Sequence, residues 1–188
     1  ENNSFIYKAV NEVNIGDKIS NSTVIGTVLL LNDKITPMYS LKTNNTNIIC
    51  TEHHTVYLGD KLIPISDVND ASKIENDKSD YVYNFIMDNG MINIDSYNYS
   101  DWNEINLGGS QYLLKSNKLS QTYNNVHEGK SLVIMNDLTI KRHDNIKPGD
   151  VLENNNLVWG VVKLIDQRSG NLKYILLCES DYYDKVKV

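Results

Sequence analysis

The sequence predicts an all-β fold made of many short strands. Apolar runs rich in β-branched and aromatic residues recur along the chain and are separated by glycine, asparagine and aspartate. Helix signals are confined to one candidate turn at 66–71. A repeated segment indicates in addition that one β unit is built twice, because copies of one sequence adopt the same supersecondary structure.

The expected strands can be placed in chain order. They lie at 23–31, 38–41, 47–50, 55–58, 81–87 and 157–165. The connections at 58–62 and 87–91 contain the Gly, Asn and Asp that supply positive φ in tight turns, so we interpret both as hairpins.

Aromatic residues gather near position 100. Tyr97 and Tyr99 alternate with polar residues, which favours one buried face, with Trp102 closing the core; an exposed binding strip is the alternative. The polar stretch 102–130 follows, and its Gly108-Gly109-Ser110 run marks the expected boundary between two modules, 1–105 and 106–188.

The repeat pairs segment 3–31 with segment 136–165. Each copy has a lysine, a Gly-Asp pair, an asparagine and an alternating apolar strand that begins at glycine. Gly16 corresponds to Gly149 and Gly26 corresponds to Gly160, so one residue is inserted between the two glycines of the second copy. We expect Asp17 and Asp150 to bond local backbone in a tight turn rather than to act as acids. The second copy stops early, which makes it a partial repeat.

Composition narrows the classes of partner. The chain has 188 residues, is 40% hydrophobic and carries a net charge of −6 with a pI near 5.2. A nucleic-acid footprint needs a basic face, so nucleic acid is not an expected partner. The sequence has neither an apolar run of spanning length nor a signal peptide at its start, and no membrane span is predicted.

Few residues offer metal or thiol chemistry. Cys50 and Cys178 each follow an apolar run, and we interpret them as equivalent core thiols, with a disulfide or metal site as the alternative. His127 and His143 are isolated in the sequence, and no Cys or His spacing is typical of zinc. The acidic loop 67–80 has the composition of a solvated surface rather than a calcium loop. We predict no cofactor and no metal.

One short motif has catalytic character. Thr51-Glu52-His53-His54 lies between two expected strands. Thr51 and His54 at a strand end can converge on one peptide bond, where a hydroxyl binds the carbonyl and an imidazole protonates the departing nitrogen. A strand-end histidine bonded to backbone is the structural alternative for His54. We expect His53 to point to the opposite face and to be exposed.

The motif and its surroundings resemble the Hint superfamily, the shared fold of inteins and Hedgehog autoprocessing domains. The chain is most similar to Hint-type domains of large DNA viruses. Four signals carry this resemblance over residues 3–104: the 13–19 turn, Thr51-x-x-His54-x-Val56, 59–68 and 82–90. The resemblance implies that Thr51 and His54 strain and protonate a scissile amide beside an N-terminal Cys or Ser nucleophile.

Both ends of the chain depart from the family pattern. No Cys or Ser stands where the nucleophile is expected, since Ser4 is too close to the first strand, and no His-Asn pair precedes Val188. We therefore expect a viral Hint-fold module that is structural and virion-associated, located in the virion or host cytoplasm, with other protein chains as partners. The asparagine-rich, arginine-poor composition is typical of an AT-rich genome. An autoprocessing domain whose nucleophile lies upstream, and a host- or carbohydrate-binding β module, are the alternatives.

The second copy is expected to lack chemistry. Aligning Cys178 on Cys50 places Glu179 at the position of Thr51 and Tyr182 at the position of His54. The copy then keeps its scaffold and loses the proton donor.

Overall fold

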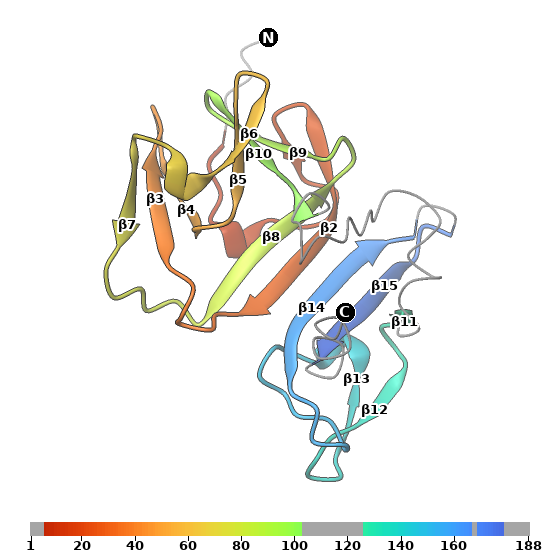
Figure 1. Cartoon of the computed structure of the whole chain (residues 1–188). Coiled ribbons are helices and arrows are strands. Elements are labelled where there is room, and N and C mark those ends of the chain that lie inside the picture. Colours follow the sequence, from red (N-terminus) through yellow and green to blue (C-terminus); the bar gives the residue numbers. More distant parts are fainter. Residues whose placement is uncertain (1–5, 103–125, 167–168, 179–188) are drawn as a thin grey trace.

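The computed structural model describes residues 6–102, 126–166 and 169–178 (Figure 1). Over these residues the chain forms short antiparallel strands joined by turns and single 3-10 turns, so the expected all-β fold is confirmed. The sequence boundary at Gly108-Gly109-Ser110 lies outside the described residues, as does Ser4.

All six expected strands are present. They are β2 (Ser22–Leu31), β3 (Met38–Lys42), β4 (Asn47–Thr51), β5 (Thr55–Leu58), β8 (Tyr81–Met87) and β14 (Val158–Ile165). The further strands are β1 (Lys18–Ile19), β6 (Lys61–Pro64), β7 (Ala71–Ile74), β9 (Met91–Ile94), β10 (Tyr97–Ser100), β11 (Val126–Glu128), β12 (Leu132–Ile134), β13 (Ile140–Arg142) and β15 (Leu172–Cys178). Three single 3-10 turns are η1 (Val10–Glu12), η2 (Ile65–Asp67) and η4 (His143–Asn145). The candidate turn at 66–71 is thus present, shifted towards its start.

Within the described ranges, the strands form four sheets. The largest has six strands in the order β1-β2-β14-β15-β11, with β8 also paired to β2. A four-stranded sheet has the order β6-β5-β10-β9, a three-stranded sheet the order β4-β3-β7, and β12 pairs with β13. Residues of β2 and β8, among them Val24 and Met87, pack with Leu41 of β3 and Tyr99 of β10 in the main core of the first module.

One of the two expected hairpins is confirmed and one is wrong. β5 and β6 form an antiparallel hairpin with Gly59 at φ +60°. β8 and β9 belong to different sheets: β8 pairs with β2, and β9 pairs with β10. The turn between them instead crosses to β2, where the Asp88 carboxylate accepts the Thr23 N–H at 3.0 Å. The hairpin in this region joins β9 to β10 through Asp95, which has φ +51°.

The two copies of the repeat form the same turn. Gly16 has φ +94° and Gly149 has φ +96°, a region that strongly favours glycine. The N–H of Gly16 donates to the Val24 carbonyl at 2.8 Å, and the N–H of Gly149 donates to the Val158 carbonyl at 2.7 Å. Each glycine therefore folds the chain back onto the strand that follows.

Both aspartates of the repeat bind backbone, as expected. Asp17 Oδ2 accepts the Asn14 N–H at 2.8 Å, and Asp150 Oδ2 accepts the Lys147 N–H at 2.9 Å. Each carboxylate also pairs with a lysine that precedes it in the chain, Lys8 at 2.6 Å and Lys141 at 2.8 Å. The lysine hydrogen bond and the backbone hydrogen bond lower the pKa of Asp17.

The inserted residue lies in the connection after the Gly-Asp pair. In the first copy Ile19 pairs with Ser22 around a two-residue turn at Ser20 and Asn21. In the second copy the N–H of Leu152 donates to the Asn156 carbonyl, which leaves a three-residue turn at 153–155. The longer turn accounts for the extra residue between the Gly-Asp pair and the strand glycine of the second copy.

The second copy lacks one segment of the first. β15 pairs with β14 as β8 pairs with β2, and both ladders have a bulge next to the strand glycine. Residues 32–80 separate β2 from β8, whereas only residues 166–171 separate β14 from β15. Segment 32–80, which includes β3 to β7, therefore has no counterpart between β14 and β15.

This register corrects the expected equivalence of the two cysteines. Cys178 pairs with Val158 as Met87 pairs with Val24, so the counterpart of Cys178 is Met87 and not Cys50. The alignment that placed Glu179 and Tyr182 on Thr51 and His54 is wrong for the same reason. Glu179 and Tyr182 themselves lie outside the described residues. Similar apolar composition around both cysteines explains the error.

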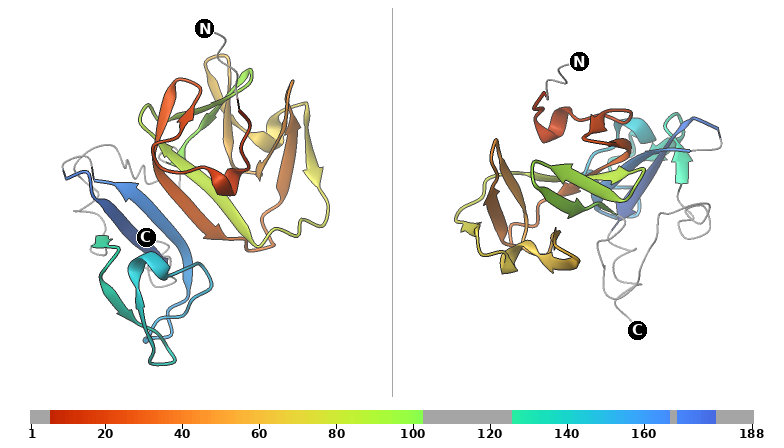
Figure 2. Two further views of the ribbon diagram at one scale, coloured as in Figure 1. Left: turned by 180° about the vertical axis from the view of Figure 1, so that it is seen from behind. Right: turned by 90° about the horizontal axis from the view of Figure 1, so that it is seen from above.

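The two copies meet through their equivalent strands, β2 and β14. Figure 1 shows these strands side by side between the two modules, and Figure 2 shows the contact from behind and from above. The antiparallel register pairs Gly26 with Leu164, Val28 with Val162, and Leu30 with Gly160. Val28 and Val162 occupy the same position in the repeat, so the pairing has a local pseudo-two-fold axis between them.

We predict that Asp150→Ala lowers the free energy of unfolding by about 1 kcal/mol, because it removes a turn hydrogen bond and strands the Lys147 N–H. Asp17→Ala should act in the same direction but more weakly, since the Asp17 side chain is 33% exposed and that of Asp150 is 21% exposed. Urea titration provides the measurement, and Asp70→Ala on the exposed loop is the matched control. Equal stability of Asp150→Ala and this control would show that the turn does not depend on the carboxylate.

Candidate functional site

The predicted catalytic pair lies in a backbone-closed turn between β4 and β5. Thr51 is the last residue of β4, and the N–H of His54 donates to the Thr51 carbonyl at 2.9 Å. The His54 carbonyl accepts the Ile65 N–H at 2.7 Å, and Glu52 donates its N–H to the Pro37 carbonyl at 2.9 Å. The structure therefore brings Thr51 and His54 together and holds their turn from two sides.

The imidazole of His54 packs inward against a core tyrosine. The ring centroids of His54 and Tyr99 are 6.1 Å apart, with an interplanar angle of 35°. Burial lowers the pKa of His54 to about 4. The ring is therefore neutral at physiological pH and lacks the acidic second proton that an imidazolium would donate to a departing amide.

Beyond His54 lies the apolar core of the first module, where Tyr99 and Cys50 carry a hydroxyl and a thiol. Tyr99 is 2% exposed, and its hydroxyl has no hydrogen-bond partner in the described part of the chain. Burial, together with the nearby Cys50 thiol, raises the pKa of Tyr99. Burial raises the pKa of Cys50 to about 12. A protonated thiol is a poor nucleophile, so this Cys50 is a packed core residue.

Both cysteines contact core clusters, as the sequence predicts for core thiols. Cys50 packs against the cluster of the first module, and Cys178 belongs to a cluster with Val158 and Leu176 in the second. Among the described residues, neither cysteine forms a disulfide bond. The tyrosine pattern is confirmed in part: Tyr99 is buried and Asn98 is exposed, but Tyr97 is only half-buried and Ser100, expected on the opposite face, is fully buried.

The first described residues are anchored away from the Thr51 turn. The Tyr7 hydroxyl donates to Asp95 at 3.0 Å, at the turn between β9 and β10. Asp95 also accepts from the Thr43 hydroxyl and from the backbone and side chain of Asn45, and these donors lower its pKa to about 2. The expectation that Thr51 and His54 face a cavity beside residues 1–4 involves residues outside the described part and stays a prediction.

The remaining histidines differ from one another. His53 is 78% exposed and lies 3.1 Å from the Glu52 carboxylate, so its expected exposure is confirmed. The interpretation of His127 and His143 as isolated is wrong, because their ring centroids are 4.4 Å apart. β11 and η4 bring them together, a contact between distant segments that no local pattern indicates. Burial lowers the pKa of His143, and its Nδ1 lies 3.3 Å from the Ser131 carbonyl.

The acidic loop is a solvated surface, as expected, with one exception. Asp67, Asp70, Glu75 and Asp80 are exposed. Asp77 instead accepts hydrogen bonds from Asn32 at 2.7 Å and Ser79 at 2.6 Å, which ties the loop to the end of β2. Within the described ranges, no group of three or more His, Cys, Asp or Glu side chains is arranged to hold a metal ion.

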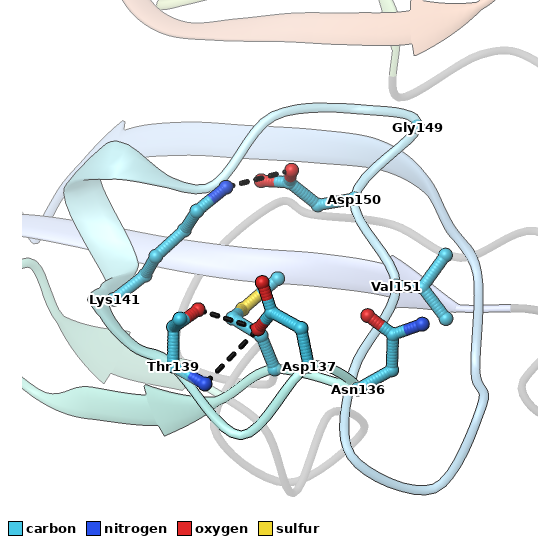
Figure 3. Close-up of a pocket in the computed structure, with 8 residues that line it drawn as sticks. Asn136, Asp137, Thr139, Lys141, Gly149, Asp150 and Val151 are labelled. Carbon is cyan, nitrogen blue, oxygen red and sulfur yellow. Dashed lines mark hydrogen bonds and ion pairs between the residues drawn. The ribbon is translucent and has the colours of Figure 1, made fainter.

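An open cleft of about 240 Å³ lies at the Gly-Asp turn of the second copy. Figure 3 shows Lys141 reaching across it to Asp150, while Asp137 turns towards Thr139. Asp137 Oδ1 accepts both the N–H and the hydroxyl of Thr139, at 3.0 and 2.6 Å. The charged groups of this cleft are thus already engaged in holding the turn.

Comparisons of the chain with protein families, with curated proteins and with solved structures found no match. In the described part of the chain, no helix has the length and apolar character to cross a membrane.

We predict that His54 makes the fold sensitive to acid. Its pKa is about 6.5 when unfolded and about 4 when folded, so the unfolded chain binds the proton first. The stability contributed by the neutral ring is complete above pH 6.5 and is lost as the pH falls towards 4. In His54→Phe, urea midpoints measured at pH 7 and pH 4.5 should therefore differ less than in the unchanged protein. His53→Gln, at the exposed neighbour, should keep the full difference, and an unaltered difference in His54→Phe would contradict the assignment.

Proposed function

We propose that this chain is a structural, non-catalytic module of the Hint type, whose partners are other protein chains. One observation carries the proposal: the His54 imidazole is half-buried and packs against Tyr99, and this loss of solvent keeps it neutral. A group that must protonate a leaving nitrogen works best with a pKa near the working pH. Here burial lowers the pKa of the ring to about 4, well below neutrality.

The hydrogen bonds around His54 support the same interpretation. The His54 backbone joins β4 to η2, and the Glu52 N–H ties the same turn to Pro37 before β3, so the turn forms one corner of the first module. The His54 ring contributes to the core on the inner side of that corner. The Thr-x-x-His motif then stabilises the fold at this turn. A module can keep such a structural role after it has lost peptide-bond cleavage.

The duplicated turn also supports a structural role. Both Gly-Asp units retain their turn geometry, their backbone hydrogen bonds and their lysine ion pairs. Segment 32–80, which contains Thr51 and His54, has no counterpart between β14 and β15. A chain that repeats its framework without the motif is typical of one used for its shape. The resemblance to Hint-type domains of large DNA viruses extends the proposal to a role in a virion assembly.

An autoprocessing domain is the second candidate. It is favoured by the direct hydrogen bond between the Thr51 and His54 backbones, which keeps the two residues of the family motif in one turn. In that mechanism an upstream Cys or Ser attacks the preceding carbonyl, the peptide nitrogen leaves with a proton, and a thioester or ester forms. The neutral ring would first have to gain its proton at a pKa near 4.

We predict that the chain is chemically inert when it is fused behind a carrier protein. Because the half-buried His54 ring is neutral, incubation with dithiothreitol or hydroxylamine should leave the fusion at its full mass by mass spectrometry. The matched variants Thr51→Ala and His54→Phe should behave identically. Thiol-dependent release of the carrier by the unchanged chain, abolished in Thr51→Ala, would overturn the structural proposal and support autoprocessing.

A further inference from the structure

The contact between β2 and β14 has the form of an interface between two copies of one molecule. We propose that it is an isologous self-association contact now enclosed within one chain, and that the β14 strand of a second copy can take the place of the chain's own β14 on β2. In an isologous contact, residue i of one partner meets residue j of the other and the reverse pair is also present. The pairs Gly26 with Leu164 and Leu30 with Gly160 meet this condition, because the strand glycines and leucines are repeat equivalents.

The strand glycines fit this contact at both symmetric positions. A Cβ on Gly160 would lie 2.6 Å from Leu30 of β2 and 3.0 Å from Leu177 of β15. A Cβ on Gly26 would lie 2.9 Å from Ile86 of β8 and 3.1 Å from the Lys163 carbonyl of β14. Each glycine therefore makes room for the opposite copy and for the neighbouring strand of its own copy.

The side chains at the contact come from both copies. Val28 and Ile86 of the first copy pack in one cluster with Val162, Ile175 and Leu177 of the second. Val28, Val162 and Ile175 are each no more than 2% exposed. Adding a strand to an exposed sheet edge supplies main-chain hydrogen bonds, and the alternate side chains supply specificity.

Each copy also completes its own turn without the other. Every strand ladder among the described residues lies within one module, except that between β2 and β14. The hydrogen bonds of the Gly16 turn end on Val24, and those of the Gly149 turn end on Val158. Apart from the β2–β14 ladder, the described ladders and both Gly-Asp turns are thus closed within one half, so no shared turn has to form on association.

The proposal can be tested on the full chain with a protease site placed at Gly108-Gly109-Ser110. One preparation carries a tag before residue 1, a second carries a different tag after residue 188, and both are cleaved. The two are unfolded in urea, mixed and refolded, and the first tag is captured. When equal amounts are mixed, recovery of the second tag at about half the molar amount of the first is the expected result, because tagged and untagged second halves are captured equally. Halves that refold without capturing each other would overturn the proposal.

Two variants test the register within the same experiment. Gly160→Val should lower recovery of the second half at least about tenfold, because its Cβ collides with Leu30. Gly26→Val in the other half should lower it similarly. Gly170→Asn, at φ +70° in the β14 to β15 turn with open space around it, is the control and should be captured normally. Circular dichroism of each refolded half shows whether a loss of capture is caused by a loss of folding. Normal capture of both valine variants in folded form would overturn the proposed β2–β14 register.

Discussion

The structure depends on β2, a ten-residue strand that is hydrogen-bonded to β8 along one edge and to β14 along the other. Side chains alternate across a strand, so residues four apart normally share a face, but the bulge between Val24 and Gly26 shifts this alternation and lets β2 bury side chains in two cores. Val24 packs in the main core of the first module, and Val28 packs in the cluster shared with the second copy. The Gly16 turn fixes where the strand begins, because its N–H is bonded to the Val24 carbonyl.

The core behind β2 also sets the chemistry of the Thr51 turn. A histidine in water is poised to exchange protons near neutral pH, whereas the ring of His54 is held neutral by its apolar surroundings. The same surroundings keep the Cys50 thiol protonated and leave the Tyr99 hydroxyl without a partner among the described residues. Burial thus keeps His54 and Cys50 in their neutral forms near pH 7, whereas a catalytic site would need groups that gain and lose protons there.

Local patterns in the sequence predicted much of the fold. Alternation and turn residues located six strands, the Gly59 hairpin and the Asp17 and Asp150 turns, because these depend on neighbouring residues. The partner of each strand was not predictable in this way. Asp88 to Gly90 have hairpin composition, yet β8 pairs with β2, which lies far away in sequence. The contacts of His127 with His143 and of His54 with Tyr99 likewise arise from tertiary packing. The Thr51-x-x-His54 motif alone therefore could not predict that the His54 ring packs against the core.

The unequal connections in the two copies have a consequence for chain entropy. The same two-stranded ladder is closed by the long segment 32–80 in the first copy and by the short segment 166–171 in the second. For flexible loops this difference in length would cost only about 2 kcal/mol. Leu41, Val56 and Ile65 of the long connection are buried against the ladder that it closes, and this packing offsets the cost. The loop between the two strands is therefore a site where a folded unit can be inserted, and the compact second copy shows the ladder without one.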